Sequence, residues 1–193
     1  MPNSWKKPNG ARKMKSLYEI RFSGSGGQGI ITAGMVLGEG ASLFDGKYVV
    51  QTQSYGPEAR GGACKTELII ADYPVNYPKP ILADILLAMS QAAYDKYIHE
   101  IKDDAFVVVD SSLVQYKPAK GVYPVPITKL AAEEVGLKVT ANVVALGVIS
   151  SLTKIASYEA LERALLSRVP RGTEEINQKA LALAKKLEFK DNV

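Results

Sequence analysis

The alternation of apolar and polar positions divides the chain into short strand-like runs and longer helical runs. In the segment 84–89 every residue after Asp84 is apolar, which is typical of a buried strand, and residues 140–155 are apolar nearly all round, which is typical of a buried helix. Strands and helices alternate as far as about residue 136, and helices follow. This order predicts an α/β fold with one domain, a single mostly parallel sheet, helices on both faces and a helical C-terminal part.

Turn residues and helix-capping residues set the predicted boundaries of these elements. The predicted strands are residues 18–22, 47–53, 63–70, 84–89, 105–110 and 121–125. The predicted helices are residues 30–44, 91 to about 101, 128–135, 140–155, 157 to about 168, and 173–187. Pro124 cannot donate to a sheet ladder, which predicts that the strand at 121–125 lies at an edge. Gly34, Gly38 and Gly40 indicate that the first helix packs very closely against the sheet or a partner.

A glycine-rich turn joins the first predicted strand to the first predicted helix. Backbone N–H groups and the helix dipole favour an anion at such a turn. Its glycines fit the dinucleotide pattern G-x-G-x-x-G, but the second strand ends in Gln53, not in an acid that could hold a ribose, and no Gly-Lys-Ser/Thr follows. A structural turn, an anion site and a partner contact therefore stay open. The candidate contact residues are Gly24, Ser25, Gly26, Gly27, Gln28 and Gly29.

A second loop, residues 54–62, follows the second predicted strand and combines glycines and a proline with an acid and a base. Proline limits φ and glycine permits positive φ, and loops of fixed shape that carry polar residues commonly meet a ligand or partner. If the sheet is parallel here, both loops lie at the carboxyl edge, where α/β sheets bind. We therefore expect an interface at Tyr55, Gly56, Pro57, Glu58 and Arg60.

The chain offers few residues for catalysis on its own. Its only cysteine, Cys64, is expected to be a small buried residue, and its only histidine, His99, is expected on a helix surface. Nothing in the spacing of Asp84 and Asp110 supports a carboxylate pair, so both are expected to be solvated strand ends. A single cysteine also excludes a four-cysteine iron–sulfur or zinc site. We predict no catalytic residue and no metal site within this chain.

Charge and composition narrow the class of partners. Much of the net charge of +4 comes from residues 1–16, which we expect to form a disordered basic tail ahead of a single domain at 17–190. The near balance of charge elsewhere argues against a nucleic-acid face. No apolar run reaches the roughly 18 residues that would suggest a membrane span, and a single cysteine fits a reducing compartment. We expect a cytoplasmic protein without nucleic-acid or membrane partners.

Several of these segments together resemble a known family, the gamma subunits of 2-oxoacid:ferredoxin (or acceptor) oxidoreductases. The matching segments are residues 24–30, 54–62, 84–91, 109–110, 142–147 and 175–181. The sequence Ser-Tyr-Gly-Pro-Glu-Ala-Arg-Gly-Gly at 54–62, with Leu-Ala-Met-Ser-Gln-Ala-Ala-Tyr at 87–94, is most similar to the 2-oxoglutarate-type branch. A pyruvate- or branched-chain-type complex is the alternative within the family, and a free-standing nucleotide-binding α/β module is the alternative outside it.

The resemblance implies a subunit that is inactive alone. The complex would oxidatively decarboxylate a 2-oxoacid with coenzyme A to an acyl-CoA and carbon dioxide, and would pass electrons to ferredoxin. It would use thiamine diphosphate, Mg, an iron–sulfur cluster and coenzyme A, with no cofactor held by this chain alone. The implied partners are alpha and beta subunits and a ferredoxin-like delta subunit. The glycine turn is then a hypothetical contact for the phosphates of coenzyme A or, alternatively, for the alpha subunit.

Overall fold

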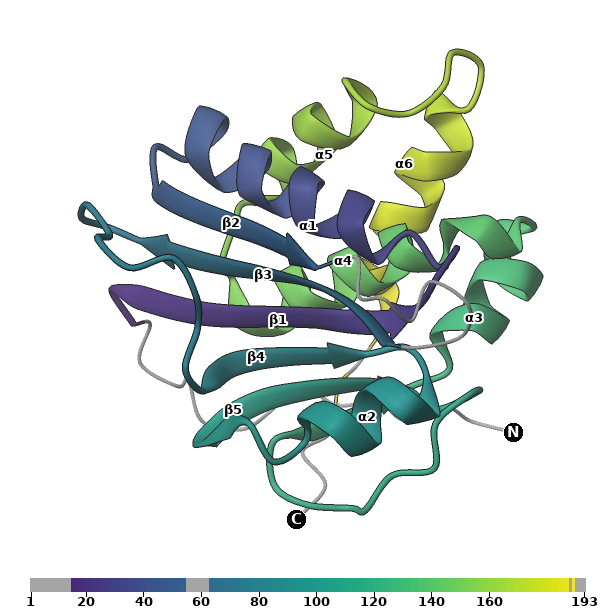
Figure 1. The fold of residues 1–193 in the computed structure, drawn as a ribbon. Helices are drawn as coiled ribbons and strands as arrows, with labels where there is room; N and C mark the ends of the chain where they lie inside the picture. The colour runs from purple at the N-terminus through teal and green to yellow at the C-terminus, as the bar shows by residue number, and fades with distance from the viewer. Residues whose placement is uncertain (1–14, 55–62, 188, 190–193) are drawn as a thin grey trace.

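The structure, a computed structural model, describes residues 15–54, 63–187 and 189 and is built around one six-stranded sheet with the order β2-β3-β1-β4-β5-β6 (Figure 1). The strands are β1 (Leu17–Ser25), β2 (Tyr48–Ser54), β3 (Ala63–Ala71), β4 (Ala83–Ala88), β5 (Ile101–Asp110) and β6 (Val122–Val125). β3 runs antiparallel to both of its neighbours, and the pairs β1–β4, β4–β5 and β5–β6 are parallel. The predicted mostly parallel sheet is confirmed, with β3 as the exception.

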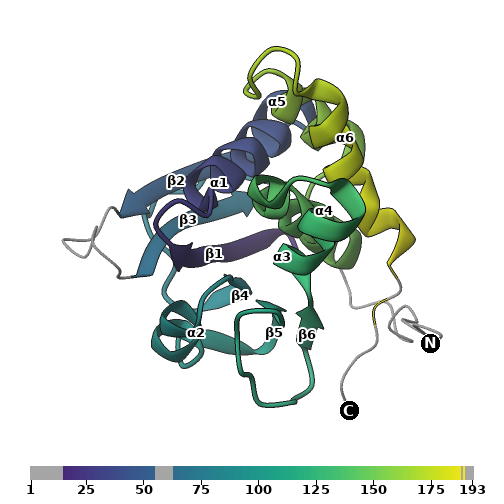
Figure 2. The ribbon, with the colours of Figure 1, turned by 90° about the vertical axis from the view of Figure 1, so that its right-hand side faces the viewer.

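Helices cover both faces of the sheet, as predicted. They are α1 (Ile30–Glu39), α2 (Gln91–Tyr97), α3 (Ile127–Leu130), α4 (Ala141–Thr153), α5 (Tyr158–Leu166) and α6 (Glu174–Leu183). α2 packs against β1 and β4 on one face, whereas α1, α4, α5 and α6 contact one another on the other face (Figure 2). The chain is helical from α3 onward, which confirms the predicted C-terminal part.

The larger apolar core lies between the sheet and the layer that contains α1 and α4. Alternate residues of β1, such as Ile20 and Phe22, are fully buried in it. Every residue of α4 from position 141 to 150 is buried, which confirms the prediction of a helix enclosed on all sides. A smaller core that includes Leu86 and Val107 lies beneath α2. Burial of this much apolar surface is the main force that holds the helices on the sheet.

Close packing of α1 on the sheet depends on a glycine. A Cβ atom added to Gly34 would lie 2.4 Å from the Cγ2 atom of Thr66 on β3, a distance that no real contact allows. The glycine therefore lets the helix backbone approach the strand, as the small residues in this helix predicted. The last residues of the predicted helix, Gly40–Phe44, form a wider helical turn after α1.

The glycine turn and the second loop begin at the same edge of the sheet. Ser25, the last residue of β1, pairs with Ala63, and Ser54, the last residue of β2, pairs with Lys65, so both strands end beside the start of β3. The expected shared edge is confirmed for the strand ends, although β3 between them is antiparallel. The five interface residues that we expected at positions 55–60 lie outside the described residues.

One helix boundary was predicted wrongly. α2 ends at Tyr97, and Ile101 is the first residue of β5, where it pairs with Ala83. The N–H of Ala83 donates to the carbonyl of Glu100 at 2.9 Å and fixes this pairing. Isoleucines three residues apart suit a helix face as well as the start of a strand, so the periodicity could not decide. The short strand that contains Pro124 does lie at the sheet edge.

Candidate functional site

The glycine turn connects β1 to α1 and leaves the start of the helix without a side-chain cap. Gly29 occupies the position before the helix with φ 70° and ψ 20°, a left-handed conformation that suits glycine. No acidic residue lies in the first turn of α1. The partial positive charge of the first N–H groups is therefore not offset by a carboxylate of that turn, which favours an anion at this position.

The side chain of Gln28 holds the turn in place. Its Oε1 accepts the N–H of Ser25 at 2.7 Å, and its Nε2 donates to the carbonyl of Met89, just after β4, at 2.7 Å. The carbonyl of Ser23 in turn accepts the N–H of Met89 at 2.9 Å. Gln28 therefore fastens the turn to the neighbouring parallel strand, and this predicted contact residue points its amide into the protein.

Asn142 also holds the turn in place, through the carbonyl of Gly29. Its Nδ2 donates to the carbonyl of Gly29 at 3.1 Å, and its side chain comes from the start of the buried helix α4. A Cβ atom on Gly29 would lie 2.4 Å from that Nδ2 atom. We did not predict Asn142 as a site residue, although a buried amide within an apolar helix must find a hydrogen-bond partner and could have been singled out for that reason.

Gly26 and Gly27 form the open part of the turn. Both are exposed, and a Cβ atom added to either would meet no atom within 4 Å. Gly27 has φ 85°, which explains its identity, but Gly26 is not among the residues with positive φ. Within the described residues, no hydrogen bond engages the N–H groups of these two glycines. The fold itself therefore gives no reason for glycine at position 26, and a close approach by another molecule would give one.

The residues considered for catalysis do not form a catalytic set. Cys64 is half-buried at the start of β3, and burial raises the pKa of its thiol, which disfavours the reactive thiolate. His99 is exposed in the turn after α2, as predicted for a surface histidine. Among the residues that the structure describes, no group of three or more His, Cys, Asp and Glu side chains is placed to hold a metal ion.

The two aspartates were predicted wrongly as solvated strand ends. Asp84 and Asp110 are 2% and 0% exposed. They lie at opposite ends of their parallel strands, because Asp84 is near the start of β4 and Asp110 is the last residue of β5, so they form no pair. The carboxylate of Asp110 accepts the N–H groups of Ser112 and Thr128 and the hydroxyl of Thr128. It secures the entry to α3, which is a structural role.

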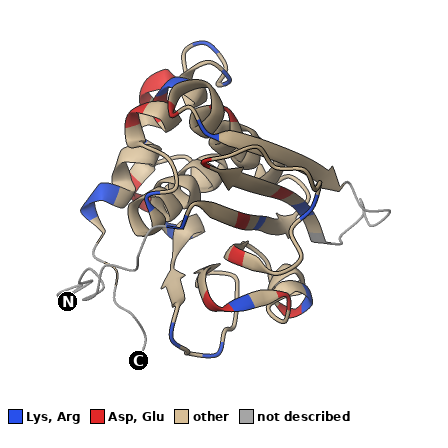
Figure 3. Cartoon of the chain, turned by 90° about the vertical axis from the view of Figure 1, so that its left-hand side faces the viewer, with Lys and Arg blue, Asp and Glu red and all other residues tan. Residues whose placement is uncertain are grey.

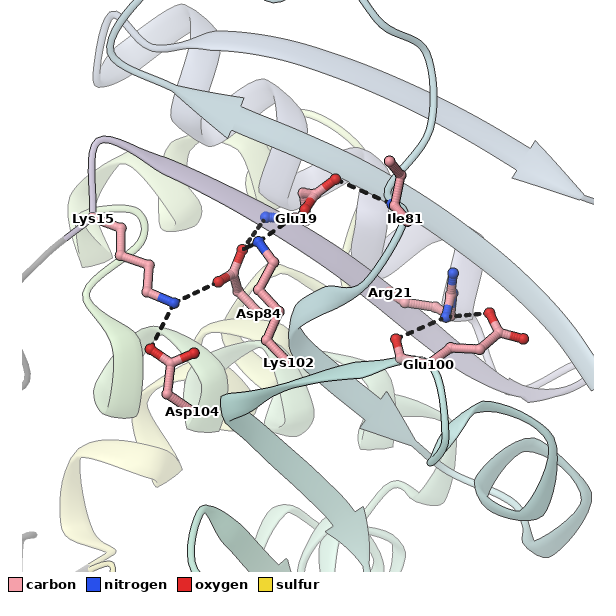
Figure 4. Close-up of polar contacts among 8 residues, drawn as sticks. All are labelled: Lys15, Glu19, Arg21, Ile81, Asp84, Glu100, Lys102 and Asp104. Carbon is pink, nitrogen blue, oxygen red and sulfur yellow. Dashed lines mark hydrogen bonds and ion pairs between the residues drawn. The ribbon is translucent and has the colours of Figure 1, made fainter.

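Asp84 organises a cluster of charges at the start of the central strands (Figure 4). Its carboxylate lies 2.7 Å from Nζ of Lys15 and 2.8 Å from Nζ of Lys102, and it accepts the N–H of Glu19 at 2.8 Å. Lys102 also pairs with the Glu19 carboxylate, and Lys15 with that of Asp104. Burial alone would lower the pKa of Lys102, but its hydrogen bonds to the two acids outweigh this effect and raise the pKa.

A second charged group lies beneath α2 on the same face of the sheet. Arg21 is 2% exposed, and its Nε donates to the Glu67 carboxylate at 2.8 Å. Its guanidinium also pairs with Glu100 at 2.7 Å and lies 5.1 Å from the centre of the Tyr97 ring. The two buried charges, those of Arg21 and Glu67, are paired with each other, which is the condition for burying them. Figure 3 shows acids and bases interspersed on the helices and strands around them.

Comparison with protein families identifies one that spans most of the chain. The family model described as pyruvate ferredoxin/flavodoxin oxidoreductase matches residues 19–187. The 2-oxoglutarate synthase subunit KorC of Methanocaldococcus jannaschii is 52% identical to this chain over 170 residues, which are 86% of this chain and 91% of that protein.

In the part of this chain that the structure describes, no helix is both long enough and apolar enough to cross a membrane.

Two solved structures share the fold. The gamma subunit of a keto/oxoacid ferredoxin oxidoreductase from Geobacter sulfurreducens has a TM-score of 0.82 and 45% identity, and the match covers 90% of this chain and 97% of that one. The 2-oxoglutarate:ferredoxin oxidoreductase from Magnetococcus marinus, solved with 2-oxoglutarate, coenzyme A and succinyl-CoA bound, has a TM-score of 0.76 and 25% identity. That match covers 93% of this chain and 34% of the larger one. The chain therefore belongs to the pyruvate ferredoxin/flavodoxin oxidoreductase family and is a gamma-type subunit of a 2-oxoacid oxidoreductase complex.

Proposed function

We propose that this chain completes a 2-oxoglutarate:ferredoxin oxidoreductase and that its glycine turn contributes to the coenzyme A site. The complex would convert 2-oxoglutarate and coenzyme A to succinyl-CoA and carbon dioxide and would pass the electrons to ferredoxin. The choice of 2-oxoglutarate rests on the 52% identity with a protein named as a 2-oxoglutarate synthase subunit. A pyruvate- or branched-chain-type complex is the alternative substrate class.

The observation that carries the coenzyme A proposal is the open surface at Gly26 and Gly27. Their backbone is exposed, neither glycine has an atom in the path of a Cβ, and α1 begins three residues after Gly27 without an acid in its first turn. A phosphate can approach a glycine backbone closely and accept hydrogen bonds from its N–H groups. Gln28 and Asn142 keep that surface in one conformation, so binding would require little ordering of the chain.

The cofactors of the proposed reaction would be held by partner chains. Thiamine diphosphate supplies the carbanion chemistry of such a reaction, and an iron–sulfur cluster carries electrons. One cysteine cannot hold that cluster, and we propose that the cofactors and the bound Mg belong to alpha, beta and ferredoxin-like delta subunits. This chain would place its glycine turn, and the loop between β2 and β3, against those subunits. We also propose that the complex works in the cytoplasm.

The alternative for the turn is a contact with the alpha subunit and none with coenzyme A. The exposed glycine backbone suits the close approach of another polypeptide as well as that of a phosphate. Both possibilities predict that the chain is inactive alone. They differ in what a side chain at position 26 would disturb, since a partner contact affects assembly and a coenzyme contact affects the KM for coenzyme A.

Affinity purification of the native protein, followed by a 2-oxoacid screen, tests the proposed function. We expect the chain to co-purify with thiamine-diphosphate- and cluster-binding subunits, and the complex to reduce ferredoxin with coenzyme A and 2-oxoglutarate faster than with pyruvate or 2-oxoisovalerate. A protein that purifies without such partners would contradict the proposal. Faster turnover of pyruvate or of a branched-chain 2-oxoacid would contradict 2-oxoglutarate as the substrate, while the proposed assembly with partner subunits would still stand.

A further inference from the structure

A cavity of about 400 Å³ lies on the face of the sheet that α2 covers. Its lining comes from α2 and the turn that follows it, from the strands β5 and β6, and from the connection between these two strands (residues 111–121). Figure 1 shows this connection passing beside α2. The volume of the cavity lies in the range of pockets that bind small molecules, which is roughly 300–1,000 Å³.

Hydrogen bonds hold the connection against α2. The side chain of Gln91 accepts the N–H of Gln115 at 2.7 Å and donates to the carbonyl of the same residue at 3.2 Å. The N–H of Lys117 donates to the hydroxyl of Tyr94 at 3.2 Å. Two of the elements that line the cavity are therefore fastened to each other within this chain. A ligand would enter a cavity that already has its shape, which lowers the cost of ordering on binding.

Apolar side chains form much of the lining, and they are buried or half-buried. They are Tyr94, Ile98, Ile101, Ala105, Val107 and Val122. Apolar surface of this kind binds the apolar body of a ligand, because contact removes both surfaces from water.

The lining also holds three hydrogen-bond donors that have no acceptor among the described residues. The hydroxyl of Tyr94, which is 7% exposed, already accepts the N–H of Lys117, so its own proton remains to be donated. The ammonium groups of Lys117 and Lys120 form no ion pair with a described residue. Donors of this kind, two of them charged, favour a negatively charged acceptor.

Two aspartates of the lining act in the opposite direction. Asp95 accepts the side-chain amide of Gln91 at 2.8 Å, whereas Asp103 is exposed on β5 and has no bonded partner in the part of the chain that the structure describes. Both carboxylates would repel an anion. Removing the charge of Asp103 should therefore have the opposite effect to removing the charges of Lys117 and Lys120.

We propose that this cavity binds a small organic carboxylate, with its apolar body on the apolar lining and its carboxylate toward Tyr94, Lys117 and Lys120. A monocarboxylate suits the cavity better than a phosphate, because an apolar lining cannot replace the water around a doubly charged group. The proposal does not depend on the glycine turn, on coenzyme A or on the identity of the 2-oxoacid.

Isothermal titration calorimetry of the full chain tests the charge requirement, with octanoate as the probe and 1-octanol as the uncharged control. The variant that combines Lys117→Met with Lys120→Met removes both charges and keeps unbranched side chains, and Lys129→Met on α3 is the matched control outside the cavity. We expect the double variant to weaken octanoate binding roughly fivefold or more and to leave 1-octanol binding within about twofold of the wild type. Asp103→Asn should tighten octanoate binding about twofold.

Matching circular dichroism spectra and Tm values would establish that the variants are folded. Octanoate binding that is unchanged in the double variant, or that weakens equally in Lys129→Met, would overturn the proposal. Tighter binding of 1-octanol than of octanoate by the wild type would also overturn it, because the cavity would then select an uncharged apolar group.

Backbone NMR of the wild type locates the ligand without any substitution. We expect octanoate to shift the N–H signals of residues 98–107 and 117–122 in a saturable way, and to leave those of the glycine turn unchanged. The absence of saturable shifts up to about 10 mM octanoate, or saturable shifts confined to other parts of the chain, would overturn the proposal.

Discussion

The internal constraints on the glycine turn predict different effects at two glycines that lie three positions apart. Gly29→Ala places a Cβ on a residue with φ 70° and 2.4 Å from the Nδ2 atom of Asn142. Gly26→Ala places the same Cβ in open space on a residue without positive φ. The two substitutions have identical chemistry, so each serves as the control for the other.

The magnitude follows from the structure. A non-glycine residue in the left-handed region costs about 1–2 kcal/mol. Displacing Asn142 also breaks its hydrogen bond to the Gly29 carbonyl, which adds about 1 kcal/mol or more because the Asn142 side chain is buried. We therefore expect Gly29→Ala to lower the free energy of unfolding by about 2–4 kcal/mol. Gly26→Ala should leave it unchanged or raise it by up to about 1 kcal/mol, because alanine restricts the unfolded chain.

Urea denaturation of the isolated chain, followed by circular dichroism, measures both free energies. In thermal unfolding, a domain of this size should lose roughly 5–15 °C in Tm for Gly29→Ala. Equal losses of stability in the two variants, or a larger loss for Gly26→Ala, would contradict the prediction. Either result would mean that Gly26 has a structural role inside the fold, and the argument for an external contact at that position would be lost.

Three further predictions concern the Gln28 hydrogen bonds of the turn, the Asp84 cluster and Cys64. Gln28→Ala should lower the free energy of unfolding by about 1–3 kcal/mol in urea titrations, because it removes two hydrogen bonds of the turn, and a stability equal to that of the wild type would show that they do not hold it. Lys102→Met should cost about 1–3 kcal/mol, because Lys15 still neutralises part of the Asp84 charge. Because the pKa of Lys102 is raised from 10.5, its contribution to the free energy of unfolding should be fully present below pH 10.5 and should disappear as pH rises through the raised pKa. Tm profiles of wild type and variant that stay parallel up to pH 12 would contradict this expectation. Cys64 should react with iodoacetamide more slowly than free cysteine at pH 8, because burial raises the pKa of its thiol, and an equal rate would contradict that burial.

The order and type of the elements could be predicted from hydrophobic periodicity, but this pattern did not predict that β3 runs antiparallel to its neighbours β1 and β2. Periodicity reports which face of a strand is buried and carries no information on the direction of its neighbour. The distance along the chain did carry that information. β2 ends at Ser54 and β3 begins at Ala63, and a connection this short suits a hairpin, since parallel strands need a crossover of about a dozen residues or more.

The position of the glycine turn was predictable, whereas its supports were not. Strand, glycines and helix are adjacent in sequence, so local pattern was sufficient to find the turn. Gln28 bonds to Met89, and Asn142 lies 113 positions from Gly29, so these contacts exist only once the sheet and α4 have packed. The burial of Asp84 has the same origin, because its lysine partners come from β5 and from the chain before β1.

Gly26 is the position at which we propose that coenzyme A approaches the chain, and kinetics of the assembled oxidoreductase with Gly26→Val test this most directly. We expect the variant to assemble with its partner subunits and to keep its kcat at saturating coenzyme A, while its KM for coenzyme A rises roughly tenfold or more, because the valine side chain displaces a bound phosphate. Lost assembly with an intact fold would assign the turn to a partner subunit. An unchanged KM in a fully assembled complex would contradict the claim.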